Sequence, residues 1–250
     1  MKKFELTAEF VTNVFGKKLF RIKALVAFGD VETGELGGFI EKEDNLSHSG
    51  NAWVSGDAQV YGNASVSGNA RVYGNAQVYG NAQVYGDAWV SDNAQVSGNA
   101  QVYGNAQVYG NAWVYGDAQV YGNASVSGNA RVSGNAWVSG NARVSGNAWV
   151  SGDAQVSGNA RVSGNAWVSG NADFAVVTGF GRYSRATTFF CCKDKILRVQ
   201  CGCFYGDLAQ FRKIVKKTHG NNKYAKEYLA IADLMELHFS GEKEKQEATE

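Results

Sequence analysis

Between Asn51 and Ala172 the chain repeats one six-residue pattern with no insertion, Ala-x-Val-(Ser or Tyr)-Gly-(Asn or Asp). Alternate residues of a strand point to opposite faces, so the Ala and Val of each hexad are predicted to face inward and the other two residues outward. The Gly and Asn/Asp pair tolerates left-handed backbone and predicts a corner after each short strand. A period this short and regular predicts a solenoid.

Three hexads are expected to close one coil of eighteen residues, with columns of Val and Ala inside. At the spacing of neighbouring strands, about seven coils would form a rod roughly 33 Å long. The pattern, aliphatic at one position and small two residues before it, resembles the hexapeptide repeat of left-handed parallel β-helices. The resemblance implies a left-handed coil, an exception to the usual right-handed crossover, and a right-handed coil is the structural alternative.

The residues before the repeat predict a cap. Segments 3–10 and 17–26 alternate apolar and polar residues like two strands joined near Asn13 to Gly16. Because the end of a β-helix exposes unpaired backbone and bare core, we assign residues 1–44 to a capping hairpin. The repeat itself is assigned to 45–176.

The residues after the repeat predict an α+β module over 177–240. Segments 187–192 and 195–201 read as a β-hairpin. Asp207 is placed to cap a helix that Gly220 ends. A second helix is expected from Asn222, which completes an αα-hairpin. One face of that helix is predicted to carry Tyr224, Tyr228, Ile231, Met235 and His238. The polar tail, 241–250, is predicted to be disordered.

Both flanks of the repeat also resemble a known family. The N-terminal flank contains Phe-Glu-Leu-Thr at 4–7, Leu-Phe-Arg-Ile-Lys-Ala at 19–24 and Gly-Glu-Leu-Gly-Gly-Phe-Ile-Glu-Lys-Glu at 34–43, and it leads through Asp-Asn-Leu-Ser into the repeats. This order is similar to that of phage and prophage hexapeptide-repeat proteins, which are often labelled polymer-forming. The resemblance implies a phage context and a C-terminal module that binds partners or forms oligomers. It implies no mechanism.

Net charge and composition limit the classes of partner that we expect and the location of the protein. With a formal net charge of +1, the chain has no long-range field to recruit nucleic acid or an anionic membrane. No apolar run approaches the roughly 20 residues of a membrane span. Glu5 and Glu9 interrupt any apolar segment that would follow Met1-Lys2-Lys3 in a signal peptide. We therefore expect a cytoplasmic protein, in the host cell if the chain is phage-encoded.

Four cysteines follow the repeat: Cys191, Cys192, Cys201 and Cys203. Thiolates are preferred zinc ligands, so the cluster invites a zinc site. However, adjacent Cys191 and Cys192 point to opposite faces of a strand, and Cys201-Gly202-Cys203 lacks the two-residue gap of a zinc knuckle. Buried, reduced thiols are the favoured interpretation, and no metal or cofactor is predicted.

No catalytic residue is predicted. Acyltransferases that share the β-helix use a histidine base, yet the histidines, His48, His219 and His238, all lie outside the repeat and are interpreted as structural. The Asp residues that replace Asn at corners are interpreted as equivalent turn residues. They are Asp57, Asp87, Asp117 and Asp153.

The outward positions vary most. Residues eighteen apart should stack, so one face carries a column in which Trp113, Arg131, Trp149 and Trp167 follow three glutamines. Another face carries the tyrosines Tyr85, Tyr103 and Tyr121 beside Gln83, Gln101 and Gln119. Exposed Trp, Tyr and Arg concentrate binding energy in interfaces, so both columns are candidate partner-binding sites. The alternative is that they are ladders that only stabilise the rod.

These observations favour a non-catalytic scaffold that self-associates and docks a protein partner, which could be a host defence or regulatory factor. Residues 53–72 return almost unchanged at 113–132, a shift that is no whole number of coils, so recognition is expected at the ends of a spacer-like rod. Two alternatives stay open. One is an acyltransferase-like enzyme. The other binds nucleic acid through basic helices that carry Arg212, Lys213, Lys216 and Lys217, with Lys223 and Lys226.

Overall fold

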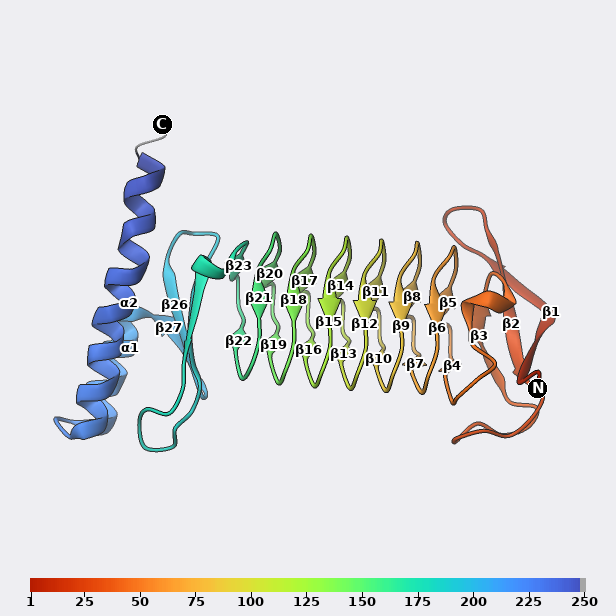
Figure 1. The fold of residues 1–250 in the computed structure, drawn as a ribbon, viewed down its shortest axis with the longest axis horizontal. Helices are drawn as coiled ribbons and strands as arrows, with labels where there is room; N and C mark the ends of the chain where they lie inside the picture. The colour runs from red at the N-terminus through yellow and green to blue at the C-terminus, as the bar shows by residue number, and fades with distance from the viewer. Residues whose placement is uncertain (248–250) are drawn as a thin grey trace.

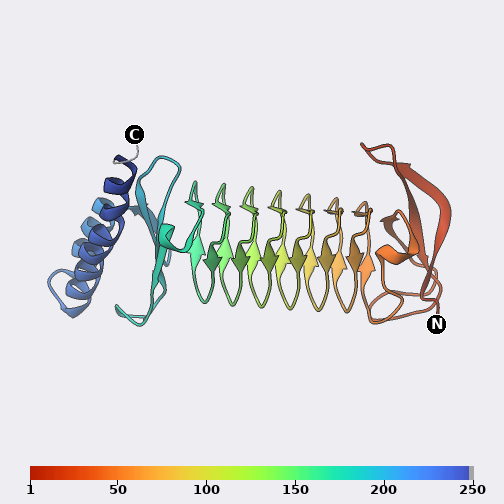
Figure 2. The same cartoon turned by 45° about the horizontal axis from the view of Figure 1, so that its top comes forward.

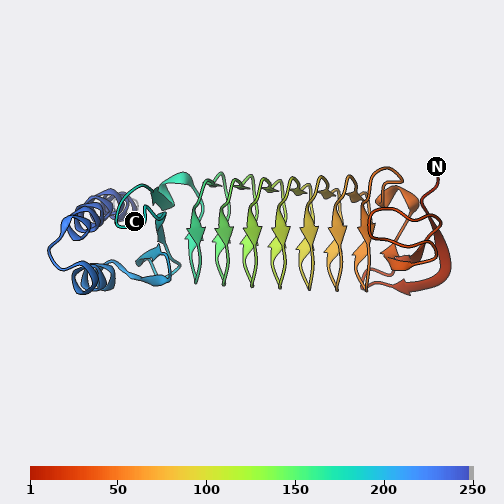
Figure 3. The same cartoon turned by 90° about the horizontal axis from the view of Figure 1, so that it is seen from below.

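The computed structural model describes the backbone of residues 1–247 and the side chains of residues 1–240. Two-residue strands, from β4 (Trp53–Val54) to β23 (Trp167–Val168), wind into a rod of about seven parallel coils (Figure 1). Antiparallel strands flank the rod, and two helices lie beyond its C-terminal end. Figures 2 and 3 show the evenly spaced coils between the two terminal modules.

The rod has three faces, each a ladder of strands eighteen residues apart. The first face contains β5 (Gln59–Val60), β8 (Gln77–Val78), β11 (Gln95–Val96), β14 (Trp113–Val114), β17 (Arg131–Val132), β20 (Trp149–Val150) and β23. The second contains β4, β7 (Arg71–Val72), β10 (Trp89–Val90), β13 (Gln107–Val108), β16 (Ser125–Val126), β19 (Arg143–Val144) and β22 (Arg161–Val162). The third contains β6 (Ser65–Val66), β9 (Gln83–Val84), β12 (Gln101–Val102), β15 (Gln119–Val120), β18 (Trp137–Val138) and β21 (Gln155–Val156). The predicted eighteen-residue coil is confirmed, and its left hand stays a prediction.

The core of the rod is as the pattern predicts. The repeat alanines from Ala52 to Ala166 and valines from Val54 to Val168 are at most 1% exposed. The corner glycines of the repeat have φ between 58° and 73°. A Cβ at Gly98 would lie only 2.9 Å from the backbone N and O of Gly116 in the next coil. Glycine is therefore required at the corner both for its backbone angle and for the close stacking of coils.

The N-terminal cap has three strands, whereas a two-stranded hairpin was predicted. β1 (Phe4–Thr12) and β2 (Lys18–Ala24) form the expected hairpin, and β3 (Leu36–Ile40) pairs antiparallel with β2 and parallel with β5. The cap therefore extends the first face of the rod as one continuous sheet. A 3-10 turn, η1 (Glu43–Asn45), leads into the first coil.

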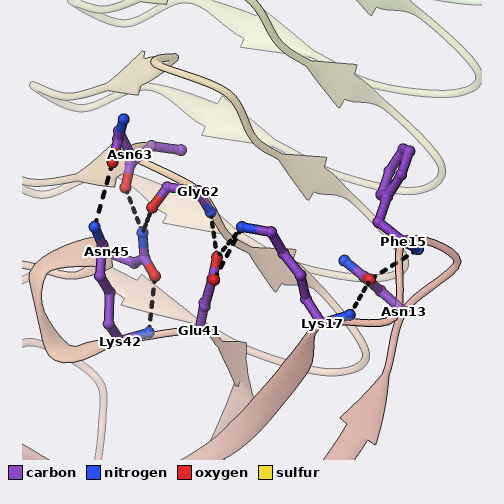
Figure 4. Close-up of polar contacts among 9 residues, drawn as sticks. Asn13, Phe15, Lys17, Glu41, Lys42, Asn45, Gly62 and Asn63 are labelled. Carbon is purple, nitrogen blue, oxygen red and sulfur yellow. Dashed lines mark hydrogen bonds and ion pairs between the residues drawn. The ribbon is translucent and has the colours of Figure 1, made fainter.

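The cap satisfies the carbonyls that the first coil exposes. Around each short strand, an N–H group of one coil donates to a carbonyl of the next, as Trp53 N donates to Ala70 O at 3.0 Å. The first coil therefore offers carbonyls with no coil before them, and these need donors. Asn45 Nδ2 donates to Gly62 O at 3.2 Å and to Ala64 O at 2.8 Å (Figure 4).

Charged side chains complete this end of the rod. The Glu41 carboxylate accepts from Gly62 N at 2.6 Å and from Lys17 Nζ at 2.9 Å (Figure 4). Lys3, only 4% exposed, donates from Nζ to Ala52 O at 2.9 Å and to Gly50 O at 3.3 Å. The buried ammonium thus donates to carbonyls that the N–H groups of a preceding coil would otherwise bond.

The C-terminal module contains one antiparallel sheet that follows the last coil. β24 (Phe174–Val177) pairs with β25 (Thr187–Cys191), followed by β26 (Leu197–Cys201) and β27 (Phe204–Asp207), in one antiparallel sheet. A second 3-10 turn, η2 (Asn171–Asp173), joins it to the rod. Phe190 of this sheet packs into the solenoid core, so the sheet closes the last coil.

Two helices follow, α1 (Leu208–His219) and α2 (Lys223–Glu247). The predicted capping box is confirmed, since Asp207 Oδ1 accepts from Gln210 N at 2.7 Å, and Gly220 ends α1.

The predicted apolar face of α2 is wrong at one position, because Phe239 is buried and His238 is exposed. The backbone is helical to Glu247. The predicted tail, 241–250, lies outside the side chains that the structure describes. Neither helix, over the described residues, is both long and apolar enough to cross a membrane.

Candidate functional site

The structure brings the predicted Trp and Arg column together on the first face. Trp113 pairs in register with Arg131, Arg131 with Trp149, and Trp149 with Trp167. The Arg131 guanidinium lies 5.9 Å from the ring centroid of Trp113. The rings of Trp149 and Trp167 are stacked, with centroids 5.6 Å apart and planes 4° from parallel. The column therefore forms one continuous aromatic and cationic strip.

Two of the indoles in the strip are hydrogen-bonded to serines. Trp113 Nε1 donates to Ser97 Oγ at 3.2 Å, and Trp149 Nε1 donates to Ser133 Oγ at 3.0 Å. Each serine stands at the Ser/Tyr position of the coil before. A small residue there leaves room for the indole, and its hydroxyl fixes the ring orientation.

A groove of about 640 Å³ opens along the C-terminal half of this strip. Arg131, Trp149 and Trp167 line it together with a row of corner asparagines, Asn129, Asn147 and Asn165. The turn between β25 and β26 supplies its end, through Lys193 and Asp194. Rod and C-terminal module thus build the groove jointly.

Backbone contacts fix that end of the groove. Ala166 and Cys192 form an antiparallel bridge, and Lys193 N donates to Asn165 O at 3.3 Å. Asp194 Oδ2 accepts from Arg198 Nη2 at 2.8 Å, so this carboxylate is already paired. Arg131 and Lys193 therefore leave the groove with a net positive charge. Sequence reasoning did not find Lys193, because it lies 26 residues beyond Trp167 in the chain.

The asparagine wall is a hydrogen-bonded ladder. Asn129 Nδ2 donates to Asn147 Oδ1 at 3.0 Å, and Asn147 Nδ2 donates to Asn165 Oδ1 at 3.2 Å. At other corners an aspartate ends the ladder. Asp117 Oδ1 accepts from Asn99 Nδ2 at 2.8 Å, but the aspartate side chain has no N–H group that could donate to the next coil. Asp and Asn make the same backbone bond at the corner, as Asp87 N to Gly104 O and Asn105 N to Gly122 O, both at 2.8 Å, but only an Asn side chain both accepts and donates.

The tyrosine column lies on the third face, away from the groove. Tyr85, Tyr103 and Tyr121 stack with centroids 4.8 Å and 5.0 Å apart. The Tyr85 hydroxyl donates to Gln101 Oε1 at 3.2 Å, and the Tyr103 hydroxyl donates to Gln119 Oε1 at 3.3 Å. Burial raises the pKa of Tyr103. These contacts favour a stabilising ladder, and the two predicted columns do not form one site.

The basic residues predicted on the helices divide into two kinds. Arg212 Nη2 lies 2.7 Å from both Asp233 Oδ1 and Glu236 Oε2, and these bonds raise the pKa of Arg212. Its charge is thus compensated within the module. The lysines of α1 are exposed: Lys213, Lys216 and Lys217.

Each histidine has aromatic or polar neighbours that favour a structural role. His48 lines a second cavity, of about 360 Å³, beside Glu43 and two serines of the first coil. Its Nδ1 accepts from Lys3 N at 3.2 Å, its Nε2 lies 3.6 Å from Glu43 Oε2, and its ring stacks on Phe4 at 4.3 Å. The ring centroids of His219 and Tyr228 lie 5.9 Å apart, and those of His238 and Phe239 lie 4.8 Å apart.

The cysteines differ in their surroundings. Cys192 is buried at the last coil, and burial raises the pKa of its thiol. Cys201 Sγ accepts from Thr187 Oγ1 at 3.2 Å. Cys203 is exposed, so the prediction of buried thiols is wrong there, because Cys203 sits in the turn between β26 and β27. Within the described residues no three His, Cys, Asp or Glu side chains form a metal-binding group.

Comparison with known families agrees with the architecture. Ten segments of the chain, which together span 58–98, 100–152 and 154–172, match the family model described as the YdcK beta solenoid repeat. A comparison with curated proteins gives no match.

Proposed function

We propose that this β-solenoid repeat protein, whose repeats are of the YdcK type, is a non-catalytic scaffold that docks a protein partner in the groove at the C-terminal end of its first face. The observation that carries the proposal is the joint construction of the groove. Stacked Trp149 and Trp167 line its length, and Lys193 of the neighbouring module lines its end.

The chemistry of the groove suits a short acidic and apolar peptide segment. Trp and Arg are the residue types that dominate binding energy at protein interfaces. Trp167 is 42% exposed although it is large and apolar. Arg131 and Lys193 are exposed cations, while Asp194 is paired with Arg198. A partner carboxylate would therefore meet two cations beside an aromatic surface.

The proposal includes self-association and a phage or prophage context in the host cytoplasm. The context rests on the family resemblance of both flanks. Self-association is supported by Leu234 and Leu237, which are 56% and 71% exposed on α2. They lie away from the buried side of that helix, which holds Tyr228, Ala232 and Met235. Exposed leucines at this spacing provide an apolar stripe for a second copy.

A photo-crosslinking amino acid placed at Trp167 tests the docking site, with Trp137 as the matched control. Trp137 is 41% exposed on the third face, outside the groove. We expect a partner crosslinked only from position 167, and we expect the purified partner to bind Trp137→Ala but not Trp167→Ala. Equal crosslinking from both positions, or undiminished binding to Trp167→Ala, would refute the site.

A further inference from the structure

The loop between β24 and β25 carries an unusual concentration of arginine and exposed aromatic side chains. Its sequence from Gly179 is Gly-Phe-Gly-Arg-Tyr-Ser-Arg. The guanidinium groups of Arg182 and Arg185 lie 5.4 Å and 4.8 Å from the ring centroid of Tyr183. Tyr183 is 64% exposed and Phe180 is 43% exposed. The loop thus presents two cations around an open aromatic ring.

Defined contacts hold this loop on the start of α2. Gly181 N donates to Glu227 Oε2 at 2.9 Å. A Cβ at Gly181 would collide with the Tyr228 hydroxyl, so only glycine allows this close approach. In Figure 1 the loop and the turn between α1 and α2 lie along the same lower edge of the module. The loop and the helix turn therefore lie at the same edge of the module, with the loop in contact with the start of α2.

Lysines surround that turn. Lys216 and Lys217 end α1, and Lys223 and Lys226 begin α2, all exposed. The nearby carboxylate, Glu227, is shared between Gly181 N and Lys223, whose Nζ lies 3.5 Å away. The loop and the two helix ends carry two arginines and four lysines beside this carboxylate, which leaves a local excess of positive charge.

The second face of the rod carries further exposed arginines near the C-terminal module. Arg143 and Arg161 lie directly opposite each other on β19 and β22, both exposed. Like charges in this position are destabilising, and neither arginine forms a salt bridge within the described part of the chain. Arg161 N donates to Thr188 Oγ1 at 2.9 Å, just beyond the loop. The last strand of the second face is therefore bonded to the strand that follows the loop.

The net charge of the whole chain is near zero, although basic residues are concentrated in the C-terminal module. Residues 177–240 contain eleven Lys and Arg but five Asp and Glu, an excess of six positive charges in a chain whose net charge is +1. The chain is thus nearly neutral as a whole, whereas this module is basic. A basic surface interleaved with exposed aromatic rings is typical of single-stranded nucleic-acid binding.

We propose that the loop at 178–186, the lysines of the α1–α2 turn and the pair Arg143 and Arg161 form a binding surface for single-stranded nucleic acid. The cations contact phosphates, and Tyr183 stacks on an unpaired base. This surface is separate from the first-face groove, so each site can fail without the other.

Fluorescence anisotropy of labelled 20-nucleotide oligo-dT and oligo-U with the full chain tests the proposal. We expect binding that weakens with salt, with a slope of log affinity on log salt near −3 for about four phosphate contacts. Arg182→Ala with Arg185→Ala should weaken binding at least about tenfold at low salt and reduce the slope by about 1.4. Lys18→Ala with Lys23→Ala, at exposed positions of β2 in the N-terminal cap, is the matched control that removes equal charge and should leave binding unchanged.

The aromatic ring gives a second, independent test. Tyr183→Ala should weaken single-strand binding at least about fivefold, and Tyr183→Phe should keep it, because the stacking ring remains. Both changes lie at an exposed position. The proposal is wrong if the wild-type chain binds neither oligonucleotide at low salt, or if the two charge variants behave alike. It is also wrong if duplex or anionic vesicles bind better than the single strand.

Discussion

Raising the pH above 8 is expected to stabilise the N-terminal cap through Lys3. Burial, and secondarily the charge of Arg71, lowers the pKa of Lys3 from 10.5 to about 8. The folded protein therefore releases this proton at lower pH than the unfolded chain. Between pH 8 and 10.5 the unfolded chain binds more protons, so the unfolding free energy rises with pH.

The size of the effect follows from the shift. At about 1.4 kcal/mol per pKa unit, lowering the pKa of Lys3 from 10.5 to about 8 corresponds to at most about 3.5 kcal/mol of unfolding free energy, and solvent screening reduces this. Below pH 8 the folded protein carries the buried ammonium, which donates to Ala52 O and Gly50 O. Replacing Lys3 with Met would remove the charge and leave these carbonyls without their donor. The two effects oppose each other, so the pH dependence reports on Lys3 better than stability at one pH.

Guanidinium denaturation of the wild-type chain and Lys3→Met at pH 7, 8, 9 and 10 measures this difference. The wild type should gain stability relative to Lys3→Met as the pH rises. Lys23→Met, at an exposed position of β2, is the control and should follow the wild type. Parallel pH profiles for the wild type and Lys3→Met would refute a desolvated ammonium at the first coil.

Two further changes test the corners of the rod by denaturant midpoints. Asp117→Asn gives residue 117 a donor toward Asn135 one coil on, and should raise stability by about 0.5 kcal/mol; a loss would contradict the ladder. Gly110→Ala should cost about 2 kcal/mol or more, because φ is 71° and a Cβ would lie 3.0 Å from Gly128 N; a cost below about 0.5 kcal/mol would contradict the close stacking.

The rod could be predicted from the sequence because its period fixes both the inward residues and the stacking distance. The third cap strand could not, because Gly37 and Gly38 read as a turn. In the structure a Cβ at Gly37 would lie 2.5 Å from Ile22 Cγ1, and one at Gly38 would lie 2.7 Å from Ala58 O. These glycines permit close approach of a strand to the first coil.

The sequence predicted only those site residues whose positions follow from the repeat period. The spacing of eighteen placed Trp149 beside Trp167, and the structure has them stacked. Lys193 lies at the end of the groove through a tertiary contact with Asn165 that no local pattern encodes. One irregular corner was also overlooked: Asp92 stands at a glycine position with φ 57°, and its Oδ2 accepts from Gly110 N at 2.9 Å. Aspartate tolerates this angle because its side chain bonds to the adjacent coil.

We expect the rod to be rigid and to set the separation and orientation of the two terminal modules, which spin-label distances can measure. Labels at Val14→Cys and Lys217→Cys, with Cys203→Ser, report on the two ends. Deleting one coil, 99–116, should shorten the axial distance by about 4.8 Å and keep the distribution narrow. Deleting one hexad, 99–104, should rotate the C-terminal module by about a third of a turn and shift the distance by a different amount. Broad distributions, or the same distance after both deletions, would contradict a rigid eighteen-residue coil.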